Sequence, residues 1–219
     1  MKKLLYLLIT VAGIFILNFF MPKTFSEARA DLDGDGVLDT VKLSYERGRI
    51  YISISSLNKV LVKRDFTAIK PESVKVCEID GKSPKEIFLA VRKSTLFHKE
   101  VKLRPFFLQY DGEKIIRKWT GSKFGEDFKD VFFIDCDRDG RDEIYTIDMK
   151  KNGKESISLH YWFLFGFIKA GESGEYEKIL SCVEKDGELM TRFEENGKVM
   201  EEKLQLIITE AAKEDEEMI

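Results

Sequence analysis

The sequence predicts an all-β protein built from antiparallel strands, preceded by an apolar N-terminal segment. Apolar and polar residues alternate in many short stretches, and Asn-Gly or Asp-Gly pairs separate several of them. The 219-residue chain is 43% hydrophobic and contains 17 Phe and 7 Tyr. Period-two alternation with such turn pairs is typical of β-hairpins, and this composition supplies a packed core and excludes a largely disordered chain.

The first thirty residues have the pattern of an export signal. Lys2 and Lys3 precede an apolar run over residues 4–21, and Ala28-Arg29-Ala30 has small residues at the −3 and −1 positions of a cleavage site. This order is typical of a secretory signal peptide. The run is also close to the ~20 residues of a membrane-spanning helix, so a retained anchor is the alternative. We therefore expect a signal peptide or membrane anchor over 1–30 and a β-rich domain over 31–219, outside the cytoplasm.

Charge and cysteine content exclude some functions. The whole chain has a net charge of −3, and residues 1–30 hold four basic residues against one acidic, so the remainder is more acidic still. An acidic body without a basic stripe is not expected to bind nucleic acid. The three cysteines, Cys77, Cys136 and Cys182, form no C-x-x-C pair. We expect buried thiols, with a disulfide between two of them as the alternative.

The strand pattern continues along the chain. Residues 41–45 and 50–54 alternate and are joined by a hairpin connection at 46–49, while apolar residues from Ile157 to Phe167 predict one long strand with His160 and Trp162 on its opposite face. Four turn pairs favour type I′ hairpins: Asp111-Gly112, Asn152-Gly153, Asp186-Gly187 and Asn196-Gly197. Only the tail over 204–217 has a helical pattern.

Two segments carry a pattern typical of metal-binding loops. Both have carboxylates at positions 1, 3, 5 and 9 and glycine at position 6. The carboxylates are Asp31, Asp33, Asp35 and Asp39 in one loop, and Asp135, Asp137, Asp139 and Glu143 in the other. Crowded carboxylates repel one another unless a cation lies between them, and Ca²⁺ takes six to eight oxygen ligands. We expect Ca²⁺ in both loops, with the position-7 carbonyls of Val37 and Arg141 as further ligands.

An EF-hand is the obvious rival for these loops. It needs a bidentate Glu at position 12, where this chain has Lys42 and Thr146. It also needs a following helix, whereas the residues after both loops have a strand pattern. The ninth-position carboxylates, Asp39 and Glu143, are therefore expected to close the sites.

An Asp-x-Asp-Gly-Asp-Gly-x-x-Asp loop followed at once by a strand resembles the calcium loops of FG-GAP/VCBS-type repeats. The resemblance covers the two loops and their following strands, and it implies blades of an integrin-like β-propeller with ligands at positions 1, 3, 5 and 9. A degenerate copy over Glu78–Glu86 strengthens the repeat. Lys82 replaces a ligand there, so we expect no metal in that loop, with the Lys82 ammonium in the place of calcium.

The number of loops bears on the architecture, and the expected cleavage position bears on which loop binds calcium more strongly. Three loop starts are fewer than the blades of a typical propeller, so an incomplete propeller, a small four-bladed ring and a curved open sheet are the alternatives. Cleavage after Ala30 would place a charged amine on Asp31, which makes loop 135–143 the expected stronger site.

No enzyme is expected. His98 and His160 are the only histidines, and nothing in the sequence brings them near a nucleophile. The function expected is that of an exported calcium-binding module for binding, adhesion or cell-envelope interaction, with an extracellular protein or carbohydrate as candidate partner. Membrane contact is expected only through residues 4–21 if they are retained. The alternative is an exported hydrolase on the same FG-GAP-like scaffold.

Overall fold

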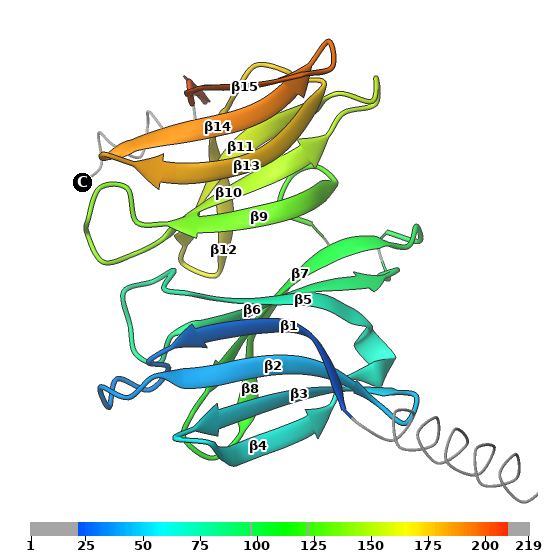
Figure 1. Ribbon diagram of the computed structural model, residues 1–219, viewed down its shortest axis with the longest axis vertical. Coiled ribbons are helices and arrows are strands. Elements are labelled where there is room, and N and C mark those ends of the chain that lie inside the picture. Colours follow the sequence, from blue (N-terminus) through cyan, green and yellow to red (C-terminus); the bar gives the residue numbers. More distant parts are fainter. Residues whose placement is uncertain (1–21, 97, 122, 210–219) are drawn as a thin grey trace, which may run out of the picture.

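A computed structural model describes residues 22–96, 98–121 and 123–209 and shows four antiparallel sheets stacked one on another (Figure 1). In each sheet, strands consecutive along the chain pair with one another, and the third sheet has one further strand from the end of the described chain. The prediction of an all-β, antiparallel fold is therefore confirmed. None of the described sheets closes into a barrel.

The first two sheets have four strands each. The first sheet contains β1 (Lys23–Ala30), β2 (Asp39–Glu46), β3 (Arg49–Ser56) and β4 (Lys59–Asp65). A short 3-10 helix, η1 (Thr67–Ile69), leads into the second sheet. That sheet contains β5 (Pro71–Cys77), β6 (Glu86–Lys93), β7 (Lys102–Tyr110) and β8 (Ile115–Thr120).

The third sheet has five strands and the fourth has three. The third contains β9 (Phe128–Ile134), β10 (Glu143–Met149), β11 (Glu155–Phe163) and β12 (Gly166–Glu172), with β16 (Ile207–Ile208) added along β12. The fourth contains β13 (Lys178–Lys185), β14 (Glu188–Glu195) and β15 (Lys198–Lys203). The chain thus leaves the fourth sheet and ends its described part on the third.

Hydrophobic cores lie between successive sheets. Alternate residues of β2 and β3 pack against the second sheet, and the next two cores join the second to the third and the third to the fourth. The strand β6 is buried on both faces: Ile87 and Leu89 belong to the first core, and Phe88 and Ala90 to the second. A strand with two covered faces has no polar side, which explains its nearly continuous apolar sequence.

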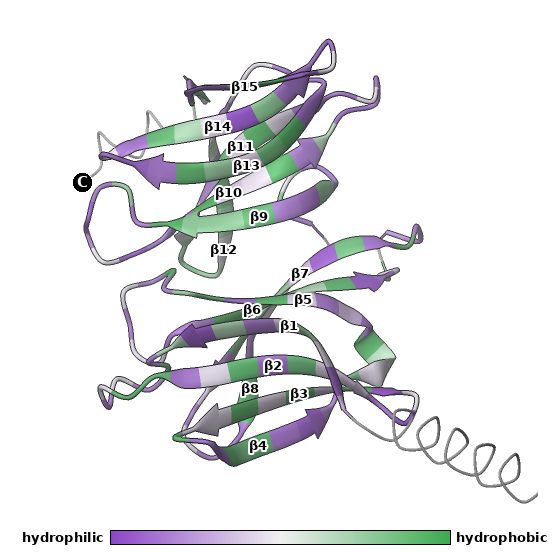
Figure 2. Cartoon of the chain, viewed as in Figure 1, coloured by the Kyte–Doolittle hydropathy of each residue, from purple (hydrophilic) through white to green (hydrophobic). Residues whose placement is uncertain are grey.

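The outer faces of the two end sheets carry many polar residues. The outer face of the first sheet carries Thr40, Lys42, Ser53 and Ser55. That of the fourth carries the charged residues Arg192, Glu194, Glu201 and Lys203 together with the exposed Val183 and Val199. Figure 2 shows the resulting alternation of hydrophilic and hydrophobic bands along these strands. Among the described residues, no hydrophobic cluster joins the first sheet to the fourth.

Three sequence-based expectations differ from the structure. Ala28-Arg29-Ala30 lies in β1, which pairs with β2, so the β-rich region begins at Lys23 and not at residue 31. The expected long strand over 157–167 was wrong: it is the hairpin β11–β12, which turns at Leu164, whose φ is +53°. The segment 204–209 contains β16 and no helix. The rest of the tail, 210–219, lies outside the described residues.

Two of the four expected turn pairs have the backbone angles of a type I′ turn. Both residues of Asp186-Gly187 and of Asn196-Gly197 have positive φ, as a type I′ turn requires, whereas Asp111-Gly112 and Asn152-Gly153 have it only at glycine. The apolar run over 4–21 lies outside the described residues. Within the described ranges, no helix is long and apolar enough to span a bilayer.

Candidate cation-binding loops

The three acidic segments occupy the same place in three sheets. Loop 31–39 joins β1 to β2, loop 78–86 joins β5 to β6, and loop 135–143 joins β9 to β10. Each connects the first strand of its sheet to the second, so all three lie at one end of the stack, on the left in Figure 1. In the fourth sheet the equivalent connection is the two-residue turn Asp186-Gly187.

A shared hydrogen bond closes each loop at its base. The carboxylate at position 9 accepts from the backbone N–H of position 2 in all three. The N···O distances are 3.3 Å from Leu32 to Asp39 Oδ2, 3.0 Å from Ile79 to Glu86 Oε2, and 2.9 Å from Cys136 to Glu143 Oε2. The same hydrogen bond between positions 2 and 9 therefore occurs in three loops that are distant in sequence.

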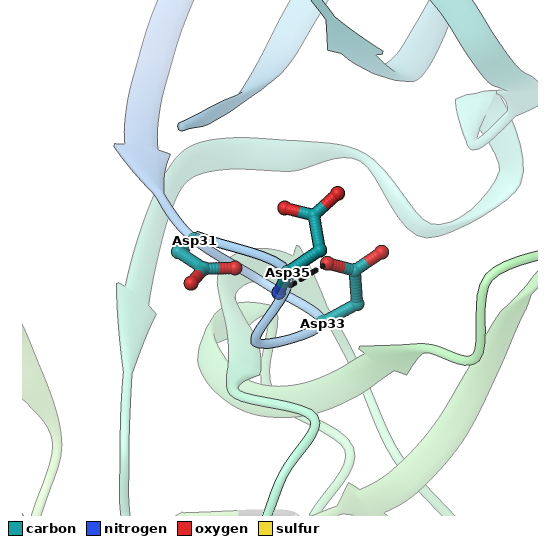
Figure 3. A group of neighbouring side chains, drawn as sticks. All are labelled: Asp31, Asp33 and Asp35. Carbon is teal, nitrogen blue, oxygen red and sulfur yellow. Dashed lines mark hydrogen bonds between the residues drawn. The ribbon is translucent and has the colours of Figure 1, made fainter. Parts of the chain in front are cut away.

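In loop 31–39, backbone N–H groups orient the three aspartates (Figure 3). Asp31 accepts from Gly34 at 2.8 Å and from Gly36 at 3.0 Å. Asp33 accepts from the N–H of Asp35 at 3.3 Å, and Asp35 from Val37 at 2.7 Å. Gly34 and Gly36 have φ of +81° and +84°, a region that glycine adopts without steric cost. As a result, one carboxylate oxygen from each aspartate lies within 4.8 Å of the other two.

Loop 135–143 repeats this geometry. Asp135, Asp137 and Asp139 also bring one oxygen each to within 4.8 Å of one another, and Gly140 donates to Asp135 Oδ2 at 3.1 Å. Asp135 Oδ1 is buried and has no hydrogen-bond partner. A buried carboxylate oxygen without a partner is costly, so this loop retains an unsatisfied acceptor.

One difference separates the two loops. The guanidinium of Arg141 pairs with Asp139 Oδ2 through Nε, at 2.6 Å, and through Nη2. This contact lowers the pKa of Asp139 and occupies one of its two carboxylate oxygens. The equivalent residue in loop 31–39 is Val37, which has no charge. The three aspartates have the same pattern of burial in both loops, so Arg141 is the difference between them. The expectation that loop 135–143 is the stronger site stays a prediction.

The ninth-position carboxylates lie beside these groups. Asp39 is 3% exposed, and burial raises its pKa, with smaller contributions from the charges of Asp33 and Asp35. Burial also raises the pKa of Glu143, with the charges of Asp137 and Asp135 adding to it. One oxygen of each is held by the position-2 N–H, and neither belongs to the groups of converging oxygens. Their role as ligands, and that of the Val37 and Arg141 carbonyls, stays a prediction.

Loop 78–86 contains its own cation, and that cation is not Lys82. Oxygens of Glu78, Asp80 and Glu86 lie within 4.8 Å of one another, and the ammonium of Lys118, from β8, pairs with Asp80 Oδ2 at 2.7 Å and with Glu86 Oε1. Gln109 Nε2 also donates to Glu86 Oε1, at 2.9 Å. Lys82 is exposed, and its backbone N–H donates to Glu78 and Asp80. The expectation that the Lys82 ammonium stands in the place of calcium was wrong.

Lys118 is held tightly in this position. Its side chain is 12% exposed and that of Glu86 is fully buried. Burial alone would lower the pKa of Lys118, but its hydrogen bonds to Asp80 and Glu86 and their negative charges raise it overall. The ammonium therefore stays charged near neutral pH. Nothing in the sequence pointed to Lys118, because it lies more than thirty residues beyond the loop that it neutralises.

The three loops contact one another in chain order. The Lys85 N–H donates to the Leu32 carbonyl at 3.0 Å, and the Asp142 N–H donates to the Glu78 carbonyl at 2.5 Å. Asp142 Oδ2 also accepts from the N–H of Glu78, at 2.7 Å. Loop 78–86 is thus hydrogen-bonded to both of its neighbours.

The polar groups away from the loops form a buried network in the third sheet. Ser158 donates to Asp148 Oδ2 at 2.6 Å, and Thr146 Oγ1 lies 3.2 Å from His160 Nε2. Asp148 and His160 are each 1% exposed. Burial lowers the pKa of His160 to about 4, and His98 is exposed. All three cysteines are free thiols; Cys77 and Cys182 are buried as expected, whereas Cys136 is exposed, so the expectation was wrong for Cys136.

Comparison with protein-family models gives no match for this chain, and comparison with curated proteins gives no significant match.

Proposed function

We propose that this chain is an exported Ca²⁺-binding β-repeat protein, with one ion in loop 31–39 and one in loop 135–143. The observation that carries the proposal is the repeated hydrogen-bond frame that brings three carboxylate oxygens together in each loop. Without a cation, these oxygens repel one another at short range. The unpartnered Asp135 Oδ1 fits the same explanation, because a hard cation accepts oxygen ligands of this kind.

The repeat organisation supports an FG-GAP/VCBS-like origin. In each of the first three sheets, consecutive strands pair and the first connection is an acidic loop, and the loops share one hydrogen-bond frame. This is the arrangement that blade-type repeats would give. Among the described residues, no hydrophobic cluster joins the first sheet to the fourth, which favours an open array of such repeats over a closed ring.

Exposed apolar residues at the same end favour a binding role. Leu57 is 82% exposed at the β3–β4 turn, and Leu164 and Phe165 are 72% and 82% exposed at the β11–β12 turn. Both turns lie at the loop end of their sheets. Leu57 and Leu164 also have positive φ, which costs a leucine conformational energy. Projecting apolar side chains of this kind are typical of contact surfaces, and an extracellular protein or carbohydrate is the partner class we propose.

The buried polar groups of the third sheet are poorly placed for hydrolysis. The titratable groups that cluster outside the loops include Asp148 and His160, and both are almost fully buried. A substrate cannot reach groups that are covered in this way. We therefore prefer the binding module to the hydrolase.

Thermal melting with calcium tests the proposal. We expect millimolar Ca²⁺ to raise the melting temperature and EGTA to reverse the rise, since an ion at a hundredfold excess over its Kd stabilises the folded state by about 2.7 kcal/mol. The Asp135→Ala/Asp137→Ala and Asp31→Ala/Asp33→Ala double variants should each lose part of the effect. Asp186→Asn, in the fourth sheet, is the matched control and should keep it. A folded protein whose melting temperature ignores calcium would disprove the proposal.

A further inference from the structure

Loop 78–86 differs from its two neighbours in having a built-in cation. Its carboxylates converge as closely as theirs, and its base is closed by the same hydrogen bond. Yet the Lys118 ammonium pairs with two of its three carboxylates. Among the described residues, no ammonium or guanidinium pairs with the carboxylates of loop 31–39, and loop 135–143 has only the contact between Arg141 and Asp139.

Lys118 reaches the loop from the fourth strand of the same sheet. Its ammonium also lies 5.7 Å from the centre of the Trp162 ring, which belongs to the third sheet. Gln109, on β7, donates a hydrogen bond to Glu86 Oε1, the same oxygen that Lys118 contacts. The ammonium is therefore fixed by groups from both the second and the third sheet, and it is mostly shielded from water.

We infer that loop 78–86 is a third cation site in which the Lys118 ammonium permanently takes the place of the metal ion. A single positive charge neutralises the repulsion that Ca²⁺ would neutralise in the other two loops. It also excludes a divalent ion, which would have to lie beside an ammonium in a poorly solvated site. Loop 78–86 thus stays ordered when calcium is withdrawn, and the calcium response is confined to the loops on either side.

This inference rests in part on the proposed calcium function, and it has a consequence that can be measured separately. Removing the ammonium should convert loop 78–86 into a calcium site, because Glu78, Asp80 and Glu86 would then converge without a counter-charge. The Lys118→Met variant keeps most of the apolar part of the side chain and removes the ammonium, with its charge and its hydrogen-bond donors. Lys129→Met is the matched control, since Lys129 also forms a partly buried ion pair, with Glu155, but not with a converging group.

The experiment is a count of bound Ca²⁺ ions by native mass spectrometry of the exported protein. We expect two ions in the wild type and in Lys129→Met, three in Lys118→Met, and two again in Lys118→Met/Asp80→Asn. Three ions in the wild type, or two in a folded Lys118→Met variant, would overturn the inference. No ion in the wild type but one in Lys118→Met would disprove the proposed calcium function and support this inference.

A wild-type measurement covers the case in which Lys118→Met does not fold. The ¹⁵N resonance of the Lys118 ammonium, followed by NMR during a calcium titration, should stay in place while the resonances of loops 31–39 and 135–143 move. Displacement of the Lys118 signal by calcium would show that the metal competes for the site and would overturn the inference. A Lys118→Met variant that folds only when calcium is added would support it.

Discussion

Asp142 forms two hydrogen bonds with the backbone of Glu78. Its carboxylate accepts from the Glu78 N–H at 2.7 Å, and its own N–H donates to the Glu78 carbonyl at 2.5 Å. Asp142 belongs to loop 135–143 and Glu78 to loop 78–86, so this pair joins the third sheet to the second. The carboxyl group is partly buried, and burial raises its pKa. This contact gives the second and third sheets a polar link in addition to their aromatic core.

We expect Asp142→Ala to lower the free energy of unfolding by about 1–3 kcal/mol, because the Glu78 N–H loses its acceptor. Asp142→Asn should cost less, since its amide oxygen can still accept. Leu38→Ala alters the same position of loop 31–39, where the side chain is 68% exposed, and should change the stability little. Urea denaturation in EGTA measures all three. Equal stability of Asp142→Ala and Leu38→Ala would show that the link contributes nothing.

Arg141 should weaken calcium binding in its own loop. Its guanidinium holds Asp139 Oδ2, so a metal must compete for this oxygen. We expect Arg141→Val, which copies Val37 of loop 31–39, to tighten calcium binding at loop 135–143 by up to about fivefold, the equivalent of an exposed ion pair worth ~1 kcal/mol.

The reverse substitution provides the control for this prediction. Val37→Arg should weaken binding at loop 31–39, and calorimetric titration can follow both sites. Unchanged affinity in Arg141→Val would mean that the guanidinium moves aside at no cost when the ion binds.

The acidic loops could be predicted from sequence because their geometry is local. Alternate carboxylates and a glycine at position 6 lie within nine residues, and the hydrogen bonds that orient them, such as Gly36 to Asp31 and Leu32 to Asp39, span no more than seven residues. The all-β class was equally accessible, since turn pairs and alternation are local too. Both predictions depended on short stretches of chain.

Lys118 could not be predicted, because its pairing with Asp80 depends on the register of β8 within the second sheet. The strand β1 was missed for another reason: it is an edge strand with small residues at Ala28 and Ala30, which also match a signal-peptide exit. The turn at Leu164 was missed because leucine is a poor residue for positive φ. Each of these features is decided by packing between distant segments.

The position of β1 leads to a prediction about processing. Cleavage after Ala30 would remove the whole strand, including Ala28, which packs against the first core, and the hydrogen bonds to β2. We therefore expect the mature chain to retain residues 23–30, whether or not the preceding segment is removed. Intact-mass spectrometry of the exported protein decides this directly.

Two recombinant chains test the contribution of β1 to stability. A chain that begins at Lys23 should unfold cooperatively, and one that begins at Asp31 should melt at a lower temperature. The same melting temperature for both chains would show that β1 is dispensable, and cleavage after Ala30 would then be compatible with the fold.

His160 should make the protein less stable in mild acid. Burial lowers its pKa to about 4, whereas the unfolded chain has the ordinary value of about 6.5. Between these values the unfolded state binds more protons than the folded state, so the free energy of unfolding falls as the pH falls from about 6.5 to 4. The full loss is about 3 kcal/mol, and it is absent above pH 6.5.

The His160→Gln variant isolates this effect, since glutamine can still hydrogen-bond to Thr146 but does not titrate. We expect the difference in unfolding free energy between wild type and His160→Gln to shift by ~3 kcal/mol across that pH range, measured by urea denaturation in EGTA so that calcium plays no part. His98→Gln, at an exposed histidine, should follow the wild type throughout. Parallel pH profiles for wild type and His160→Gln would mean that the buried ring accepts a proton without cost, for example by turning toward Glu172, whose charge favours the protonated form.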